Sequence, residues 1–72
     1  MARDVCIQLG KRIRQFRKDR GWRQLDLATE AGINENYVSD LELGRKEPCL
    51  RTLATLAKAF GIKLEELLCG VD

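Results

Sequence analysis

Residues 24–43 read QLDLATEAGINENYVSDLEL, which is two short amphipathic segments joined by a tight connection. Apolar residues at helical spacing predict one helix over residues 24–31 and a second over residues 35–43. The side chains expected to face inward are Leu25, Leu27, Ala28, Val38 and Leu41. Gly32 can take the positive φ that such a connection requires, and Asn34 is a good N-cap for the second helix. Two helices joined by so short a turn cross at a steep angle.

The outward side of the second helix has an unusual composition. It consists of Glu35, Asn36, Ser39, Asp40 and Leu43. A helix side that is merely solvated more often carries Lys and Glu, whereas four of these five residues are polar side chains that donate or accept hydrogen bonds. This pattern predicts a surface that recognises something.

The rest of the chain predicts three more helices and no strand. Val5, Leu9, Ile13 and Phe16 recur at the helix period, after Asp4 as a cap and before Gly21 as a stop. Gly10 lies inside that helix, and a close backbone approach would explain it. A fourth helix, which stops at Gly61, has an apolar stripe made of Leu50, Leu53, Leu56, Ala57 and Phe60. A fifth is expected over residues 64–68, so the predicted fold class is an all-α domain of five helices.

Composition excludes several functions. The sequence has 72 residues and no histidine, which removes the commonest general base and the commonest metal ligand. It has no apolar run long enough to cross a membrane and no apolar core of a signal peptide at its start. Three cysteines (Cys6, Cys49 and Cys69) are too widely spaced for a zinc site and odd in number, which favours reduced thiols in a cytoplasmic protein. We expect a binding domain, not an enzyme, with no cofactor, metal or small-molecule ligand and no membrane contact.

Charge is distributed unevenly along the chain. Residues 1–23 carry eight basic and two acidic side chains, whereas residues 24–72 carry five basic and nine acidic ones. The cationic first third could face a polyanion or could be no more than a solvated helix surface.

A longer string of residues resembles a known family. It runs Leu9-Gly10-x-x-Ile13-Arg14-x-x-Arg17, then Gly21-Trp22-x-Gln24-x-x-Leu27-Ala28-x-x-Ala31-Gly32-Ile33, then Val38-Ser39-x-Leu41-Glu42-x-Gly44-Arg45, with Pro48, Leu53, Leu56, Ala57, Phe60 and Gly61 behind. Residues 9–68 thereby resemble the lambda-repressor-like helix-turn-helix family of phage repressors and Cro. Among its members, the chain is most similar to the small controller proteins of restriction–modification systems.

The resemblance implies a five-helix fold whose third helix lies in the major groove of DNA. It implies base contacts by Glu35, Asn36, Ser39 and Asp40. It implies phosphate contacts by Arg23, Gln24, Asn34, Tyr37, Arg45 and Lys46, although Tyr37 could be half core and Lys46 only solvated. It also implies a structural ion pair between Arg17 and Glu42.

Three positions depart from the family pattern. Arg23 stands where the family prefers a capping side chain before the second helix, and Cys49 stands where the fourth helix would be capped, so both caps are expected to be weak. The reading surface is also acidic, through Glu35 and Asp40, which suggests that flanking basic groups supply affinity while the acids reject wrong bases.

The function expected from this resemblance is sequence-specific regulation of transcription on double-stranded DNA. A single domain of this size contacts about four or five base pairs, so we expect a homodimer on an inverted repeat. Residues 1–72 are read as one DNA-binding domain, with a helix-turn-helix over residues 24–43 and a dimerisation region over residues 49–72. The expected dimer interface comprises Ile62, Leu64, Leu67, Leu68 and Cys69. Alternatively, these leucines only close the core of the monomer.

A controller protein is favoured over a phage or plasmid repressor, because the chain shows no separate ligand-binding or dimerisation domain. RNA polymerase is left open as a partner. The alternative from a different class is an antitoxin whose main partner is a toxin protein.

Overall fold

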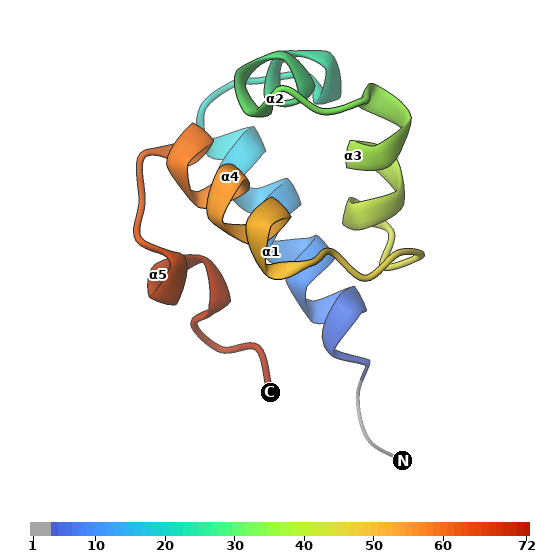
Figure 1. Ribbon diagram of the computed structural model, residues 1–72, viewed down its shortest axis with the longest axis vertical. Coiled ribbons are helices and arrows are strands. Elements are labelled where there is room, and N and C mark those ends of the chain that lie inside the picture. Colours follow the sequence, from blue (N-terminus) through green and yellow to red (C-terminus); the bar gives the residue numbers. More distant parts are fainter. Residues whose placement is uncertain (1–3) are drawn as a thin grey trace.

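Five helices and no strand make up residues 4–72, the part of the chain that the computed structural model describes (Figure 1). In chain order they are α1 (Val5–Asp19), α2 (Gln24–Ala31), α3 (Glu35–Glu42), α4 (Leu50–Phe60) and α5 (Leu64–Leu68). Helix α1 packs against α3 and α5, while α2 packs against α3 and α4. The predicted all-α, five-helix fold is confirmed. The predicted bounds differ at the end of α3, where Leu43 is the C-cap and no longer part of the helix.

Side chains and glycines set the helix ends. The carboxylate of Asp4 accepts a 2.8 Å hydrogen bond from the backbone N–H of Cys6, and the Asn34 side chain accepts one of 2.7 Å from that of Asn36. Each bond satisfies an N–H group that has no partner within its own helix. Gly32, between α2 and α3, has a φ of 67°, in the left-handed region that favours glycine. The predicted turn is therefore present.

The core lies where α1, α2 and α4 meet the inner sides of α3 and α5. Its largest fully buried side chains are Ile13, Leu27, Leu41, Leu56, Leu67 and Val38. Two predicted core residues are not in it, because Leu25 is 45% exposed and Leu50 is 68% exposed. Both lie in the first turn of their helix, at the margin of the core, so the apolar stripe of α4 begins at Leu53.

Helices α1 and α3 touch backbone to backbone at Gly10. A Cβ atom at this position would lie 2.5 Å from the carbonyl oxygens of both Leu41 and Glu42. Backbone oxygens held in a helix cannot move aside, so only glycine allows this approach. The close approach predicted for Gly10 is confirmed, and it fixes the end of α3 against the middle of α1.

Candidate nucleic-acid interface

A buried ion pair holds α3 in place. Arg17 of α1 contacts Glu42 of α3 in bidentate fashion, with Nε to Oε2 at 2.6 Å and Nη2 to Oε1 at 3.0 Å. The Arg17 Nη1 atom also donates to the carbonyl of Trp22, and Gln24 Nε2 donates to Glu42 Oε1 at 3.2 Å. The hydrogen bond to Glu42 raises the pKa of Arg17 above its ordinary value. Since bidentate pairs are directional, these contacts fix the angle of α3 as well as its position.

The outward side of α3 is polar and accessible. Glu35 and Asn36 are exposed, whereas Ser39 and Asp40 are half-buried. The Asp40 carboxylate lies 3.6 Å from Lys46 Nζ, which is 5.9 Å from the centre of the Tyr37 ring. The ring itself is half-buried against the core, so part of Tyr37 is core and its edge is surface. A lysine therefore offsets the negative charge that Asp40 would bring to a DNA surface.

The start of α2 has a cap that the sequence reasoning missed. Arg23 supplies no capping oxygen, but its backbone N–H donates to Asp26 Oδ2 at 2.7 Å, and its guanidinium lies 3.1 Å from Asp26 Oδ1. The Arg23 side chain lowers the pKa of Asp26 through these hydrogen bonds. A side chain three residues after the N-cap that accepts from the N-cap backbone N–H forms one half of a capping box. The acidic Asp26 at this spacing is the sequence signal that could have predicted the cap. Arg23 is thus partly engaged, while Arg45 of the following loop is exposed.

The basic residues of the first third have divided roles. Arg3 lies outside the described residues. Arg12 donates to the carbonyl of Leu67 at 2.9 Å, and Arg20 donates to the carbonyls of Phe16 and Phe60, so these two arginines tie helices together. Lys11, Arg14 and Lys18 form no ion pair or side-chain hydrogen bond within residues 4–72. Some basic side chains of the first third therefore stabilise the fold, and only the others are available to a polyanion.

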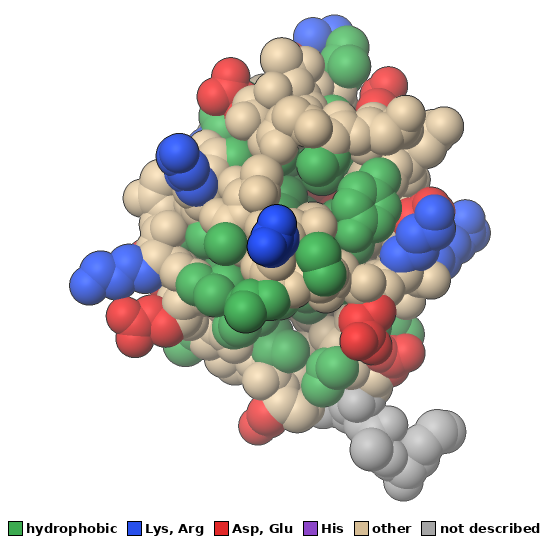
Figure 2. Space-filling view, in the orientation of Figure 1, with side chains coloured by type: hydrophobic (Ala, Val, Ile, Leu, Met, Phe, Trp, Pro, Cys, Tyr) green, Lys and Arg blue, Asp and Glu red, His purple; other side chains and the backbone are tan. Residues whose placement is uncertain are grey.

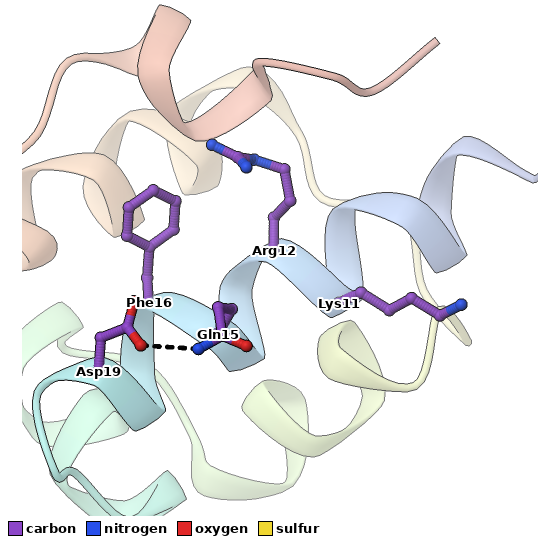
Figure 3. Close-up of a pocket in the computed structure, with 5 residues that line it drawn as sticks. All are labelled: Lys11, Arg12, Gln15, Phe16 and Asp19. Carbon is purple, nitrogen blue, oxygen red and sulfur yellow. Dashed lines mark hydrogen bonds between the residues drawn. The ribbon is translucent and has the colours of Figure 1, made fainter.

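Two of the hollows beside α1 contain basic side chains and lie on different sides of the helix. One, of about 300 Å³, is lined by Lys11, Arg12, Gln15, Phe16 and Asp19 (Figure 3). In it Gln15 is bonded to Asp19 and Arg12 points toward the C-terminal segment, so its polar groups are largely satisfied. The other, of about 200 Å³, lies between α1, α2 and α3 and is lined by Arg14, Arg17, Gln24, Ser39, Glu42 and Leu43. Sequence reasoning missed Arg14 as a site residue, although its position three residues before Arg17 places both on one side of α1.

The predicted dimer region is only partly accessible. Ile62, Leu64 and Leu68 are half-buried against the core and Cys69 is exposed. The prediction for Leu67 is wrong: its side chain is fully buried in the core of the chain itself, where α5 packs against α1 and α4, so it cannot face a partner.

Apolar surface is present near these residues. The most exposed large apolar side chain of the described chain is Leu50, and Val5 is also exposed. A hollow of about 240 Å³ is lined in part by Val5, Leu53, Leu68 and Val71. Hydrophobic side chains gather near the centre of the face on which α4 lies in front, around one basic side chain, and the other charged side chains lie further out (Figure 2).

Neither a metal cluster nor a membrane span is found in the described part of the chain. Residues 4–72 contain no group of three or more His, Cys, Asp or Glu side chains placed to hold a metal ion. None of their helices is both long enough and apolar enough to cross a bilayer.

Comparisons with known proteins agree with this geometry. The helix-turn-helix family matches residues 13–67. The chain is 46% identical over 66 residues to the HTH-type transcriptional regulator DdrOP3 of Deinococcus deserti, covering 92% of the chain and 51% of that protein. It is 37% identical over 61 residues to the immunity repressor protein of Bacillus phage phi105, covering 85% of the chain and 42% of that protein. The chain thus spans about half the length of these two relatives, or less.

A solved structure of similar size extends the comparison. The crystal structure of the restriction–modification controller protein C.AhdI from Aeromonas hydrophila superposes with a TM-score of 0.84 at 32% identity. The superposition covers 86% of this chain and 94% of the controller protein. Together with the buried ion pair and the tight turn at Gly32, these matches show that the chain belongs to the helix-turn-helix family, in its lambda-repressor-like form.

Proposed function

We propose that this protein regulates transcription by binding a specific double-stranded DNA sequence through α3. The observation that carries the proposal is the outward side of α3: its polar side chains are accessible, while its inner side is locked to α1 by Gly10 and the Arg17–Glu42 pair. Second helices of this motif lie in the major groove with their N-terminal residues at the base edges. A fixed angle is what such docking requires.

Base reading is assigned to the first two turns of α3. Asn36 is exposed and can pair in bidentate fashion with an adenine, while Glu35 or Asp40 can accept a hydrogen bond from a cytosine amino group. Ser39 is half-buried at the flank of the helix. The same proposal includes phosphate contacts by residues at the start of α2, at the start of α3 and in the loop after it: Arg23, Gln24, Asn34, Tyr37, Arg45 and Lys46.

A homodimer on an inverted repeat completes the proposal. Two copies related by a two-fold axis would place their α3 helices about 34 Å apart, one turn of DNA. The proposed interface consists of Ile62, Leu64, Leu68 and Cys69, extended by the exposed Leu50 and without Leu67. The support is the exposure of Leu50 and Cys69 and the partial exposure of Ile62, Leu64 and Leu68, since apolar surface on a small domain often marks an interaction site. RNA polymerase remains a proposed partner of the DNA-bound form.

Among regulators, the controller class is favoured because the similarity to C.AhdI extends over 94% of that short protein. A phage repressor is the second candidate, because the chain is also 37% identical to the phi105 immunity repressor over 61 residues.

Binding-site selection from a random DNA pool, followed by fluorescence anisotropy at several salt concentrations, tests DNA reading. We expect one recovered inverted repeat and a steep fall of log affinity with log salt. Asn36→Ala should cost about 1–3 kcal/mol on that site and relax one base position, whereas Lys46→Ala should weaken all sequences about equally. Recovery of no consensus sequence, together with a flat salt response, would refute the function.

Sedimentation at micromolar concentration tests the dimer. Leu50→Glu changes an exposed side chain and should give a folded monomer, whereas the matched control Leu25→Glu, on α2, should leave the dimer intact. If the unmodified protein sediments as a monomer and binds the inverted repeat without cooperativity, the dimer proposal is wrong.

A further inference from the structure

The buried polar side chains that line the hollow between α1, α2 and α3 are bonded to one another. Glu42 receives two hydrogen bonds from Arg17 and one from Gln24. The remaining terminal nitrogen of the Arg17 guanidinium donates to the Trp22 carbonyl. The charges of Arg17 and Glu42 offset each other within this network, so neither is left to attract a ligand of opposite sign.

The walls of the same hollow carry unsatisfied donors. Arg14 is exposed and has no ion pair or side-chain hydrogen bond within residues 4–72, and the Ser39 hydroxyl across from it has none either. A guanidinium offers five N–H donors and no acceptor, so the excess charge of the hollow is positive. The chemistry that fits is an anion with several acceptor oxygens, such as a phosphate.

The position of the hollow beside α3 indicates that the phosphate belongs to the DNA backbone. Ser39 and Leu43 form its wall on α3, on the flank of the helix side that carries Asn36. A helix seated in the major groove has a phosphate backbone along each of its flanks, and backbone contacts fix its register on the duplex. The open hollow therefore lies where one strand of the duplex would pass.

We propose that this hollow is a phosphate-binding subsite in which Arg14 and the Ser39 hydroxyl hold one phosphodiester of the DNA backbone. The inference rests on the proposed function, and it moves Ser39 from base reading to backbone binding. It gives α1 a direct contact with DNA, so that one helix both supports α3 and holds the strand beside it.

The test is a double-mutant cycle that measures DNA affinity and combines the substitution of Arg14 with the neutralisation of individual DNA phosphates. The DNA is the inverted-repeat duplex selected by the unmodified protein, with a neutral methylphosphonate placed at the same backbone position of both half-sites, one position at a time. At one position the neutral linkage should weaken binding of the unmodified protein by about tenfold or more, as loss of a charged hydrogen bond does. Arg14→Gln should be weakened by a similar factor on the natural duplex and should lose almost nothing further at that position. Ser39→Ala should show a smaller effect at the same phosphate.

Two controls accompany the cycle. Arg14→Gln should reduce the slope of log affinity against log salt by about 0.9 for each bound protomer, or about 1.8 for the proposed dimer, whereas Lys58→Gln, at an exposed lysine of α4 outside the hollow, should leave the slope unchanged. Both variants alter exposed side chains, so their urea unfolding curves should match that of the unmodified protein.

The outcomes separate the two proposals. If the unmodified protein selects no DNA, the proposed function fails and the subsite falls with it. If it binds DNA but no phosphate position is coupled to Arg14, the subsite is wrong and the function stands. A change in the preferred base with Arg14→Gln would likewise overturn the subsite, because a backbone contact carries no sequence information.

Discussion

Helices α3 and α5 both pack on α1, and they are held there by different physical means. The end of α3 touches the α1 backbone at Gly10 and is bonded to Arg17 through Glu42. Helix α5 is only five residues long and has no side-chain cap. It is held by one fully buried side chain, Leu67, and by hydrogen bonds from Arg12 to its last carbonyls.

The difference separates orientation from attachment. Bidentate hydrogen bonds and a backbone contact have narrow geometry, so they fix the angle of α3. The hydrophobic effect of burying a leucine is non-directional. The burial of Leu67 therefore attaches α5 to the core without fixing the orientation of its outer side. The proposed base reading by α3 requires directional support of the first kind. The proposed contact of α5 with a second copy requires only that the helix stays attached.

The largest expected effect is at α5. Leu67→Ala removes a fully buried side chain and should lower the free energy of unfolding by about 3–4 kcal/mol. Leu25→Ala, at an exposed site outside the proposed interface, should change it by less than about 0.5 kcal/mol. Urea unfolding at several protein concentrations measures both and reveals any linked dimerisation. If Leu67→Ala kept its full stability as a monomer, Leu67 would be a surface residue and the contrast between the two helices would be false.

The next effect is at the ion pair. Glu42→Ala leaves the Arg17 guanidinium buried without its partner and should cost about 3 kcal/mol of stability. The double variant with Arg17→Ala should cost clearly less than the sum of the single variants, because the two side chains act as a unit. DNA affinity should fall in all three variants. Strict additivity in the cycle would mean that the pair does not orient α3.

Gly10→Ala disrupts the backbone contact between α1 and the end of α3. The added methyl group would lie 2.5 Å from two carbonyl oxygens and must push α3 away from α1. Overpacking of this kind costs about 1–3 kcal/mol, which exceeds the gain expected from a better helix former. Lys18→Ala, at an exposed position of α1, is the matched control. A Gly10→Ala variant as stable as the control and with unchanged DNA affinity would show that the close approach is dispensable.

The sequence predicted those parts of the fold that depend on local rules. The helix periods, the caps at Asp4 and Asn34 and the turn at Gly32 follow from spacing and backbone geometry alone. Gly10 could be singled out as costly inside a helix, but its partner in space could not be identified from local signals. The residues of the Arg17–Glu42 pair came from the family resemblance, since 25 positions separate them in the chain.

What could not be predicted depends on which neighbour covers a helix side. Leu50 was expected on the apolar stripe of α4 and Leu67 in a dimer interface, yet Leu50 is 68% exposed and Leu67 is fully buried, because α5 packs against both α1 and α4. The internal roles of Arg12 and Arg20 could not be predicted for the same reason, because their acceptors are backbone carbonyls up to 55 residues away. Charge counting could not tell these two arginines from Arg14, which has no ion pair or side-chain hydrogen bond within residues 4–72.

The smallest expected effect concerns a helix start. Helix α3 begins with the side-chain cap of Asn34, whereas Cys49 makes no such bond at the start of α4, and its Sγ atom contacts Thr52 Oγ1 at 3.4 Å. Serine is a preferred N-cap, so Cys49→Ser should raise the free energy of unfolding by about 0.5–1 kcal/mol. Cys69→Ser, at an exposed cysteine that is not an N-cap, should leave it unchanged.

A pH series sharpens this last comparison. The hydrogen bond with Thr52 and the nearby backbone N–H groups lower the pKa of Cys49 below its ordinary value. The folded chain therefore releases the thiol proton more easily than the unfolded chain does, and stability should rise as the pH passes from the folded pKa toward the ordinary thiol pKa. Cys49→Ser cannot ionise, so its stability should lack this rise, and the two unfolding free energies should converge at alkaline pH. A constant difference between the two proteins across this range would show that the start of α4 does not favour the thiolate.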